Sequence, residues 1–198
     1  MTASGPSLVA HPLTPDRWAD LERLFGPNGA SSNCWCAYQR VSGAEFGRGC
    51  ANGGAGNRAL LRALTDEGRR PGILAFRGDE PVGWISAGPR VEFGRLLRSP
   101  VTRLAREERG DPTVWSVACL FLPRRSRGQG IARFLLGAAV EAARAAGGRR
   151  IEGYPVDTDG RRIESGSAFM GTRDLFEQAG FTVRAEHWKG RPVMSLDL

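Results

Sequence analysis

A run of glycines and arginines between residues 124 and 133 is the part of this sequence best suited to chemistry. Gly128 and Gly130 allow the backbone to approach a ligand closely and to point successive N–H groups at it. The helix expected from Ile131 onward adds partial positive charge at its N-terminus, where anions bind. Four arginines in the same stretch supply forked donors for phosphate groups. The segment therefore predicts a site for a pyrophosphate-bearing cofactor.

Two other phosphate-binding loops do not fit these residues. A P-loop requires a Gly-Lys-Ser/Thr sequence, and no lysine occurs in residues 120–133. A dinucleotide-binding loop requires a third glycine, whose place Arg133 occupies, and basic residues separate its glycines from the strand. An arginine-rich surface turn is the structural alternative. The order of strand, loop, glycines and amphipathic helix favours the binding site over that turn.

The residues from Arg125 to Gly130, Arg-Ser-Arg-Gly-Gln-Gly, match the pattern Gln/Arg-x-x-Gly-x-Gly/Ala. In this feature the chain resembles the pyrophosphate loop of the GNAT superfamily, the acyl-CoA-dependent N-acyltransferases. Val82-Gly83-Trp84 is similar to the family's hairpin before the loop, and residues 175–181 are similar to its last helix and following strand. The resemblance covers about residues 70–198, whereas residues 1–70 correspond to the family's variable part on the acceptor side.

The resemblance implies an N-acetyltransferase that moves an acetyl or other acyl group from acyl-CoA directly to a primary amine. Acetyl-CoA, or another acyl-CoA, would be the co-substrate, without a metal ion. Backbone groups of Leu120 and Leu122 would pair with the acyl and pantetheine amides. The cofactor contacts that it implies are Leu120, Phe121 and Leu122 on the strand, Arg125, Arg127, Gly128, Gln129 and Gly130 in the loop, Ile131, Ala132 and Arg133 on the helix, and Phe176.

Phe176 is a departure from the family, in which a tyrosine often stands at this position and protonates the departing thiolate. Tyr154 on the neighbouring strand could be the acid instead, with core packing and a bonded hydroxyl as the alternative for it. Asp157 or Glu164 could be the base, directly or through water, although loop carboxylates are commonly only solvated. A backbone N–H group near Leu120 would polarise the thioester carbonyl.

An acceptor site is predicted in the polar and aromatic segment 32–40, Ser-Asn-Cys-Trp-Cys-Ala-Tyr-Gln-Arg. Trp35, Tyr38 and Arg40 are its candidate substrate-binding residues, and packing of the two aromatic rings in the core is the alternative. The partner expected there is a small-molecule amine, or else an amine of a protein, and these residues do not identify it. A homodimer is compatible with the sequence.

The sequence has four cysteines, Cys34, Cys36, Cys50 and Cys119. We expect reduced thiols, because nothing in the sequence indicates an oxidising compartment. One residue separates Cys34 from Cys36, whereas paired zinc ligands usually have about two to four residues between them, so no metal site is expected. Cys119 lies beside the expected reaction centre, which leaves an acyl-cysteine route open, although no neighbouring histidine or lysine would activate its thiol.

The elements that must position these residues alternate along one chain. Hairpins around one internal strand–helix–strand unit predict an α/β (α+β) fold, with a mixed, mostly antiparallel central sheet of about six to seven strands flanked by helices. We expect one domain over residues 1–198. Strands are expected at 8–13, 73–76, 82–87, 114–122, 151–156, 181–185 and 193–198. Helices are expected at 15–25, 57–67, 99–109, 131–146 and 173–179, and loops at 41–57 and 157–167.

The chain has 198 residues and a formal net charge of +7, from 28 Lys and Arg against 21 Asp and Glu. Residues 124–133 contribute +4 and residues 95–109 contribute +3, so the rest of the chain is neutral. More than half of the excess lies on the expected phosphate loop, which favours a cofactor over a polynucleotide. A nucleic-acid-binding module is an alternative, but no recognition motif in the sequence supports it. A GNAT-like protein that binds CoA without catalysis is another, suggested by Phe176.

Membrane association is not expected. The longest apolar run, Val117–Leu122, is far shorter than the roughly 20 residues that a membrane span needs. Residues 1–15 carry neither a basic n-region nor an apolar h-region, so a secretory signal is not expected either. These observations lead us to expect a cytoplasmic enzyme.

Overall fold

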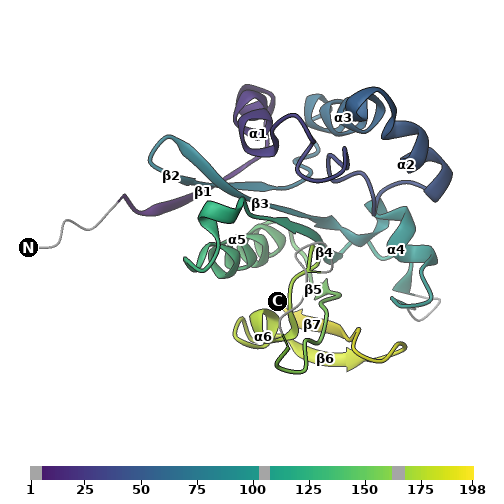
Figure 1. The fold of residues 1–198 in the computed structure, drawn as a ribbon. Coiled ribbons are helices and arrows are strands. Elements are labelled where there is room, and N and C mark those ends of the chain that lie inside the picture. The colour runs from purple at the N-terminus through teal and green to yellow at the C-terminus, as the bar shows by residue number, and fades with distance from the viewer. Residues whose placement is uncertain (1–5, 103–107, 162–167) are drawn as a thin grey trace, which may run out of the picture.

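The computed structural model describes residues 6–102, 108–161 and 168–198. Within these residues, seven strands form one sheet in the order β1-β2-β3-β4-β5-β7-β6 (Figure 1). β4 and β5 pair in parallel, and all other neighbours are antiparallel. The strands are β1 (Leu8–Pro12), β2 (Ile73–Arg77), β3 (Glu80–Pro89), β4 (Val114–Phe121), β5 (Arg150–Gly153), β6 (Thr182–Ala185) and β7 (Val193–Asp197). The predicted fold class is confirmed.

Helices cover both faces of this sheet (Figure 1). On one side lie α1 (Trp18–Phe25), α2 (Gly43–Gly49) and α3 (Ala51–Asp66), and on the other lies α5 (Ile131–Ala145). Two short helices are α4 (Gly94–Arg98), which follows β3, and α6 (Arg173–Glu177) near β7. Short 3-10 turns are η1 (Pro15–Arg17), η2 (Arg90–Glu92) and η4 (Arg124–Ser126).

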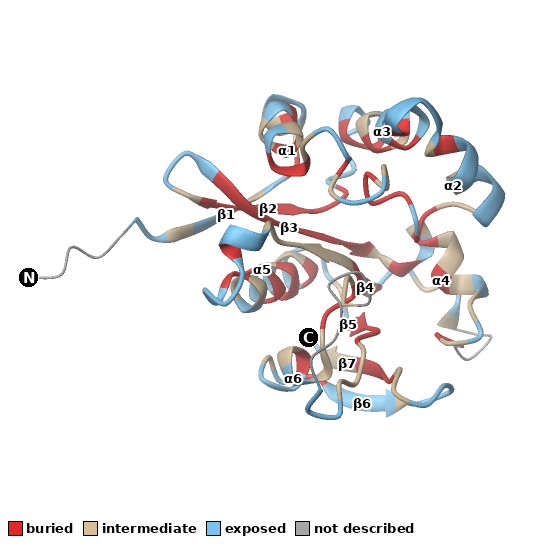
Figure 2. Ribbon diagram, in the orientation of Figure 1, coloured by how far each residue is buried: buried red, intermediate tan, exposed pale blue. Residues whose placement is uncertain are grey.

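The apolar stripes of α1 and α5 build separate cores on the two faces of the sheet, and Figure 2 shows buried residues on the sheet-facing sides of both helices. The end of β4 contributes to both cores, because successive side chains of a strand point to opposite faces. Cys119 and Phe121 pack with the α1 core, whereas Leu120 and Leu122 pack with the α5 core. The carboxyl end of β4 therefore presents side chains to both faces of the sheet.

β4 and β5 separate halfway along β4. They pair only from Val114 to Val117, opposite Arg150 to Gly153. The register between β3 and β4 shifts at the same place, because Ser86 faces Cys119 whereas Ala87 faces Val117, which leaves Ala118 as a bulge. Bulges bend a strand and end its pairing. The last residues of β4 thus leave β5 and open a gap at this edge.

The glycine-rich stretch 41–57 was expected to be a loop, and that expectation was wrong. α2 forms within it, started by a capping box in which Ser42 and Glu45 bond each other's backbone N–H groups. A Cβ atom on Gly56 would lie 2.9 Å from Gly49 Cα, so glycine allows α2 and α3 to approach closely. Residues 52–54 have left-handed backbone angles and kink the start of α3. Close packing requires the glycines at 49, 54 and 56, whereas Gly53 has open space around it and a positive φ.

Other boundaries also differ from those predicted. α4 had no predicted counterpart, and β5 ends at Gly153, beyond which Val156 makes only an isolated bridge to Thr172. In the helix expected at 99–109, residues 99–102 are not helical, and residues 103–107 lie outside the described residues.

Candidate functional site

The loop expected to bind phosphate forms between β4 and α5. Gly128 and Gly130 adopt left-handed backbone angles, with φ of 72° and 76°. Gly130 is the N-cap of α5, and its carbonyl accepts the N–H of Phe134 at 3.0 Å. The N–H groups of residues 131–133 have no acceptor within the helix, because helical geometry provides none for the first turn. These donors and the positive end of the helix suit a phosphate group.

Side-chain hydrogen bonds fix the shape of the loop. Arg125 pairs with Glu80 at 3.0 Å, and Arg77 donates to Gln129 Oε1 at 2.6 Å. The Gln129 amide in turn donates to the Arg125 carbonyl at 2.6 Å. Both members of the Arg125–Glu80 pair are exposed, so the pair contributes at most about 1 kcal/mol. Because Glu80 neutralises Arg125, the excess charge at the loop is smaller than the sequence window suggests.

Of the remaining loop arginines, Arg127 is the one that borders the cavity described next. Its Nε donates to the Leu122 carbonyl at 3.2 Å, which ties the loop to the end of β4. Arg133 bonds the side-chain oxygen of Gln178, just beyond α6. The loop therefore presents Arg127 toward a ligand, while Arg133 connects α5 with the C-terminal part of the chain.

A cavity of about 670 Å³ begins at this loop. Arg127 and Ala132 line it at the phosphate end, and the gap beside the end of β4 contributes residues 119–122. Segment 30–38 and segment 168–175 complete its walls. The cavity thus connects the phosphate loop with the segment predicted to bind the acceptor, as a reaction between two bound molecules requires.

Segment 168–172 lies in the gap between β4 and the chain that follows β5. The Leu120 N–H donates to the Phe169 carbonyl at 2.6 Å on one side. On the other side, the Val156 N–H donates to the Gly171 carbonyl at 3.1 Å, and the Val156 carbonyl accepts from Arg173. The Leu120 N–H, predicted to polarise a thioester, is therefore already bonded. It can serve a substrate only when the Phe169 carbonyl gives it up.

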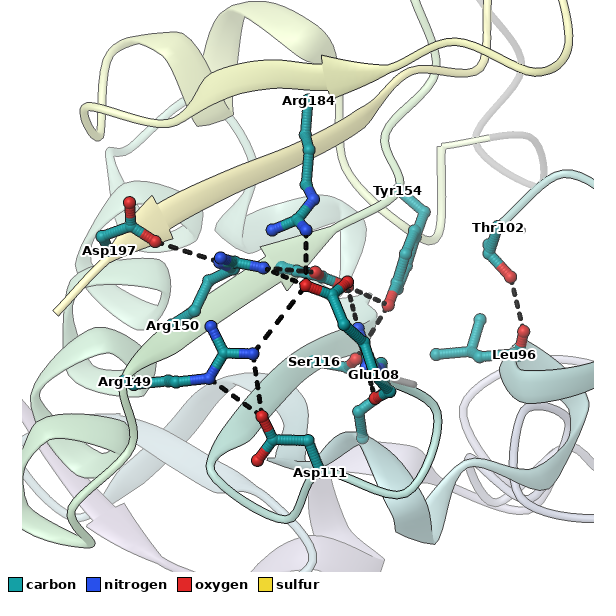
Figure 3. A network of polar contacts seen from close by, with 12 residues as sticks. Leu96, Thr102, Glu108, Asp111, Ser116, Arg149, Arg150, Tyr154, Arg184 and Asp197 are labelled. Carbon is teal, nitrogen blue, oxygen red and sulfur yellow. Dashed lines mark hydrogen bonds and ion pairs between the residues drawn. The ribbon is translucent and has the colours of Figure 1, made fainter. Parts of the chain in front are cut away.

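Tyr154, predicted as an acid, lies in a buried polar network (Figure 3). Its hydroxyl donates to Glu152 Oε2 at 3.2 Å and lies 2.9 Å from Ser116 Oγ. The fully buried Arg90 donates to the same carboxylate oxygen at 2.8 Å. Burial raises the pKa of Tyr154 well above its ordinary value, so the phenol keeps its proton. Because Tyr154 does not line the cavity, this placement argues against a role as acid.

Glu108 gathers arginines beside this network (Figure 3). Its carboxylate accepts from Arg184 at 2.7 Å and from Arg150 at 3.3 Å, and Arg149 lies 3.9 Å away. Hydrogen bonds from Thr113, and then from Arg149, lower the pKa of the neighbouring Asp111 to about 2. Each arginine described here has an acidic partner, so the cluster connects parts of the chain.

Asp157, another catalytic candidate, also lies away from the cavity. The Asp157 carboxylate binds the Asp159 N–H and Arg173, which lower its pKa, and it is absent from the cavity lining. Glu164 lies outside the described residues. Phe176 is fully buried, because Gly153 and Gly171 pack against its ring. The residue of α6 that lines the cavity is Leu175, not Phe176.

Of the three predicted acceptor residues, Tyr38 lines the cavity. Its ring packs edge-on against Phe169, with centroids 6.0 Å apart. Trp35 is buried and stacks on Trp18 at 6.1 Å. Arg40 is buried too, and pairs with Glu92 at 3.0 Å. Trp35 and Arg40 therefore pack in the interior. For Trp35 this is the core packing given above as the alternative to acceptor binding. The structure does not support a role of either residue in acceptor binding.

The acceptor end of the cavity holds three thiols, two from the predicted acceptor segment and Cys119, which was expected beside the reaction centre. Cys34 and Cys36 line it from segment 30–38, and Cys119 lines it from β4. Five residues of this segment adopt the left-handed conformation that side chains disfavour. They are Ala30, Ser32, Asn33, Trp35 and Cys36, with φ between 44° and 72°. Such strain is characteristic of binding sites, and no residue pattern in the sequence indicates it.

Cys34 is expected to react slowly with alkylating reagents. Burial raises the pKa of its thiol to about 11, so little thiolate exists near neutral pH. Labelling with iodoacetamide, followed by peptide mass spectrometry, should accelerate about tenfold per pH unit between pH 7 and 9. A rate that levels off by about pH 9 would indicate an ordinary cysteine and contradict this placement.

The model of the acetyltransferase (GNAT) family matches residues 48–162 of this chain. This range contains β2 to β5 with the phosphate loop and α5, and it spans more than half of the sequence. The chain belongs to the GNAT acetyltransferase family. Membership of that family supports acyl transfer from CoA in general, with acyl-CoA as co-substrate. No curated protein matches the sequence significantly.

Solved structures of GNAT proteins share this fold over nearly their whole length. The PaiA N-acetyltransferase of Thermoplasma acidophilum, in complex with coenzyme A, has a TM-score of 0.54 at 13% identity, covering 97% of this chain and 99% of that one. An N-acetyltransferase of Staphylococcus aureus Mu50 has a TM-score of 0.55 at 11% identity, covering 96% of this chain and 98% of that one. The diaminobutyrate acetyltransferase EctA of Paenibacillus lautus, in complex with its substrate and coenzyme A, has a TM-score of 0.51 at 16% identity. The match covers 98% of this chain and 96% of that one.

The described part of this GNAT chain shows neither a cluster of metal ligands nor a membrane-spanning helix. Among its described residues, no three His, Cys, Asp or Glu side chains gather closely enough to hold a metal ion. Over the same residues, no helix combines the length and apolar character needed to cross a bilayer.

Proposed function

We propose that this GNAT protein is an N-acetyltransferase that transfers an acetyl or another acyl group directly from acyl-CoA to a primary amine of a small molecule. The observation that carries the proposal is one cavity that connects the N-terminus of α5 with the thiol- and tyrosine-lined segment 30–38. The N–H groups of residues 128–133 and Arg127 fit a pyrophosphate. Leu120 and Leu122 lie where a pantetheine arm would pass toward Cys119.

Catalysis in this cavity would depend mainly on positioning. Holding an amine and a thioester at attack distance removes much of the entropic barrier. Polarisation of the thioester carbonyl would come from the Leu120 N–H once the Phe169 carbonyl releases it. The apolar walls exclude water, which favours a neutral, nucleophilic amine over its ammonium form. Proton transfer by Asp157 or Glu164 remains a prediction for the state with substrates bound.

The acceptor is proposed as a class, a primary amine on a small molecule. EctA, a structural neighbour, was solved with L-2,4-diaminobutyric acid, which supports an amine as the acceptor. At 16% identity, it does not indicate that diaminobutyric acid is the acceptor of this chain. The amine would approach from segment 30–38, past Tyr38. We also propose one domain over residues 1–198, with residues 1–70 on the acceptor side, and a cytoplasmic location.

A screen of amines with several acyl-CoAs tests this function. The protein is incubated with acetyl-CoA and amine panels that include alkyl amines, aryl amines and amino acids. Release of CoA thiol and the mass of the N-acyl product are measured together. We expect thiol release that depends on an amine and matches the amount of product. Acetyl-CoA binding without product formation for any amine or acyl-CoA would contradict the proposal.

A CoA-binding protein without transferase activity is the second candidate. Two observations favour it, namely phenylalanine at position 176 and the bond that occupies the Leu120 N–H. It predicts a thermal shift with both CoA and acetyl-CoA, and no product in the amine screen. The two candidates share the ligand site and differ only in turnover.

Replacement of Tyr154 by phenylalanine distinguishes a structural from a catalytic role. Since its hydroxyl is buried and bonded to Glu152 and Ser116, we expect a loss of about 1–2 kcal/mol in unfolding free energy. The kcat of acyl transfer should change less than about threefold. Chemical denaturation and steady-state kinetics measure both quantities. A decrease in kcat of a hundredfold with unchanged stability would make Tyr154 the acid after all.

A further inference from the structure

Aromatic rings from three separate parts of the chain line the cavity. Tyr38 precedes α2, Phe121 ends β4, and Phe169 precedes α6. The rings of Tyr38 and Phe169 are nearly perpendicular, at 88°, with centroids 6.0 Å apart. A ligand ring that stacks on one of them therefore meets the other at a right angle, and aromatic pairs favour both arrangements. This pair of rings suits a ligand with a flat aromatic body.

Arg95, on α4, fixes the ring of Tyr38. The guanidinium carbon of Arg95 lies 4.2 Å from the centroid of that ring, which is a cation–π contact. Its Nε donates to the Tyr38 carbonyl at 2.6 Å, and its backbone N–H donates to the Gln39 carbonyl at 3.0 Å. Arg95 itself is absent from the cavity lining. The ring is thus held in one place by a charge that lies outside the acceptor space.

Segment 168–172, which carries the second ring, has anchors other than the Leu120 N–H. Met170 is buried, and its sulfur accepts from the Gln39 amide at 3.4 Å. The Gly171 carbonyl accepts a backbone N–H at 3.1 Å on the side that faces away from β4. Neither contact involves Leu120. The segment therefore stays attached at the acceptor end of the cavity when that one bond is released.

Charge is confined to the other end of the cavity. Among the described residues that line it, Arg127 is the one charged side chain, and it borders the phosphate loop. The acceptor end is lined by aromatic rings, small side chains and thiols. Burial raises the pKa of the Cys34 thiol to about 11, so this thiol is uncharged near neutral pH. A second charged group on an acceptor would lose its water here without gaining an opposite charge from these residues.

We propose that the acceptor is an aromatic primary amine without a second charged group, such as a phenylalkylamine. The inference rests on the proposed function, because it specifies the acceptor of that reaction. The aromatic body packs against Tyr38 and Phe169, and the amine points toward Cys119, where the thioester would lie. The neutral amine nitrogen attacks the thioester carbonyl, so that a C–N bond forms and the C–S bond breaks. The CoA thiolate leaves and takes up the proton that the nitrogen loses.

A matched set of amines tests this acceptor class. Phenethylamine is compared with cyclohexylethylamine, which lacks the aromatic ring, with the free amino acid L-phenylalanine, which adds a carboxylate, and with putrescine, which carries a second amine. The kcat/KM of each amine is measured at saturating acetyl-CoA, from CoA release and product mass. We expect phenethylamine to exceed cyclohexylethylamine about threefold and the two charged amines at least about tenfold. An equal or higher value for any of the other three would overturn the proposal.

Variants of the aromatic pair test where the acceptor binds. Tyr38 is exposed, so Tyr38→Leu should fold, and it should abolish the preference for phenethylamine over cyclohexylethylamine while the KM for acetyl-CoA changes less than about twofold. Phe169→Leu is the second variant and should have the same effect. Trp188→Leu replaces an exposed aromatic residue outside the cavity lining, so it is the control and should behave as the parent chain. A preference that survives both Tyr38→Leu and Phe169→Leu would overturn the placement.

Binding measured without turnover separates this inference from the proposed function. Phenethylamine is titrated calorimetrically into the full chain saturated with CoA, which has no acyl group to transfer. Binding that Tyr38→Leu weakens, together with no N-acyl product from any amine, would contradict the transferase and support the aromatic amine site. Product formed best from a charged amine would support the transferase and overturn the aromatic acceptor. Neither binding nor product would contradict both.

Discussion

Replacement of Gly130 by valine is expected to raise the dissociation constant for acetyl-CoA at least tenfold. Gly130 has a φ of 76°, a conformation that costs a β-branched residue about 1–2 kcal/mol. Its Cβ would meet no protein atom within 4 Å, so the loss would come from backbone strain and from blocking close approach of phosphate. A change of about 1.4 kcal/mol corresponds to a factor of ten in affinity. Isothermal titration calorimetry measures this change.

Gly137 provides the matched control on the same helix. It lies inside α5, is exposed, and a Cβ there would also meet no atom within 4 Å. Gly137 is not in the left-handed region, so valine is tolerated and unfolding free energy should change by less than about 0.5 kcal/mol. Gly137→Val should bind acetyl-CoA as the parent chain does. Equal affinity of the Gly130 and Gly137 variants would show that phosphate does not bind at this helix end.

Replacement of Arg90 by leucine is expected to have the largest effect on stability, about 3–5 kcal/mol in unfolding free energy. Arg90 and Glu152 are fully buried and 2.8 Å apart, so removing this cation leaves a buried carboxylate whose remaining ion pair, to Arg150, is 3.9 Å long. Ser116 and Glu152 face each other in the register of β4 and β5. The network therefore lies at the closed end of the gap, and its loss should also weaken acyl-CoA binding.

Urea denaturation followed by tryptophan fluorescence measures this effect. Arg144→Leu is the control, because Arg144 pairs with Glu141 at 2.7 Å on the surface of α5 and should cost under about 1 kcal/mol. The double variant Arg90→Leu/Glu152→Leu should recover part of the loss, since it leaves no buried charge. A cost for Arg90→Leu no greater than that for Arg144→Leu would contradict the buried ion pair.

The sequence was sufficient to predict the strand, loop and helix around the phosphate site. Gly128 and Gly130 specify backbone angles that few other residues adopt, and the apolar stripe after them specifies a helix. These are local signals within a short stretch of chain. Alternation along β4 likewise places Cys119 and Phe121 on the face opposite Leu120. Local signals of this kind do not depend on the rest of the fold.

The side chains around the cavity were harder to predict, because tertiary contacts decide which face is covered. Tyr154 directly follows β5, beside the gap, yet its hydroxyl is bonded to Glu152 and Ser116 in the interior. Trp35 and Arg40 are residue types that binding sites often use, but residues distant in the sequence bury both of them. The bond between Leu120 and Phe169 joins segments whose spacing in sequence gives no sign of contact.

Hydrogen exchange of the full chain, with and without acetyl-CoA, tests the proposed cofactor site most directly. The N–H groups of residues 128–133 face a ligand at the end of α5, so peptides covering them should exchange more slowly when acetyl-CoA binds. Exchange at Leu120 should change as well, because its N–H is the group that would leave the Phe169 carbonyl for the thioester. Protection limited to regions outside residues 120–133, at acetyl-CoA concentrations that saturate binding, would contradict the assignment of this loop as the acyl-CoA site.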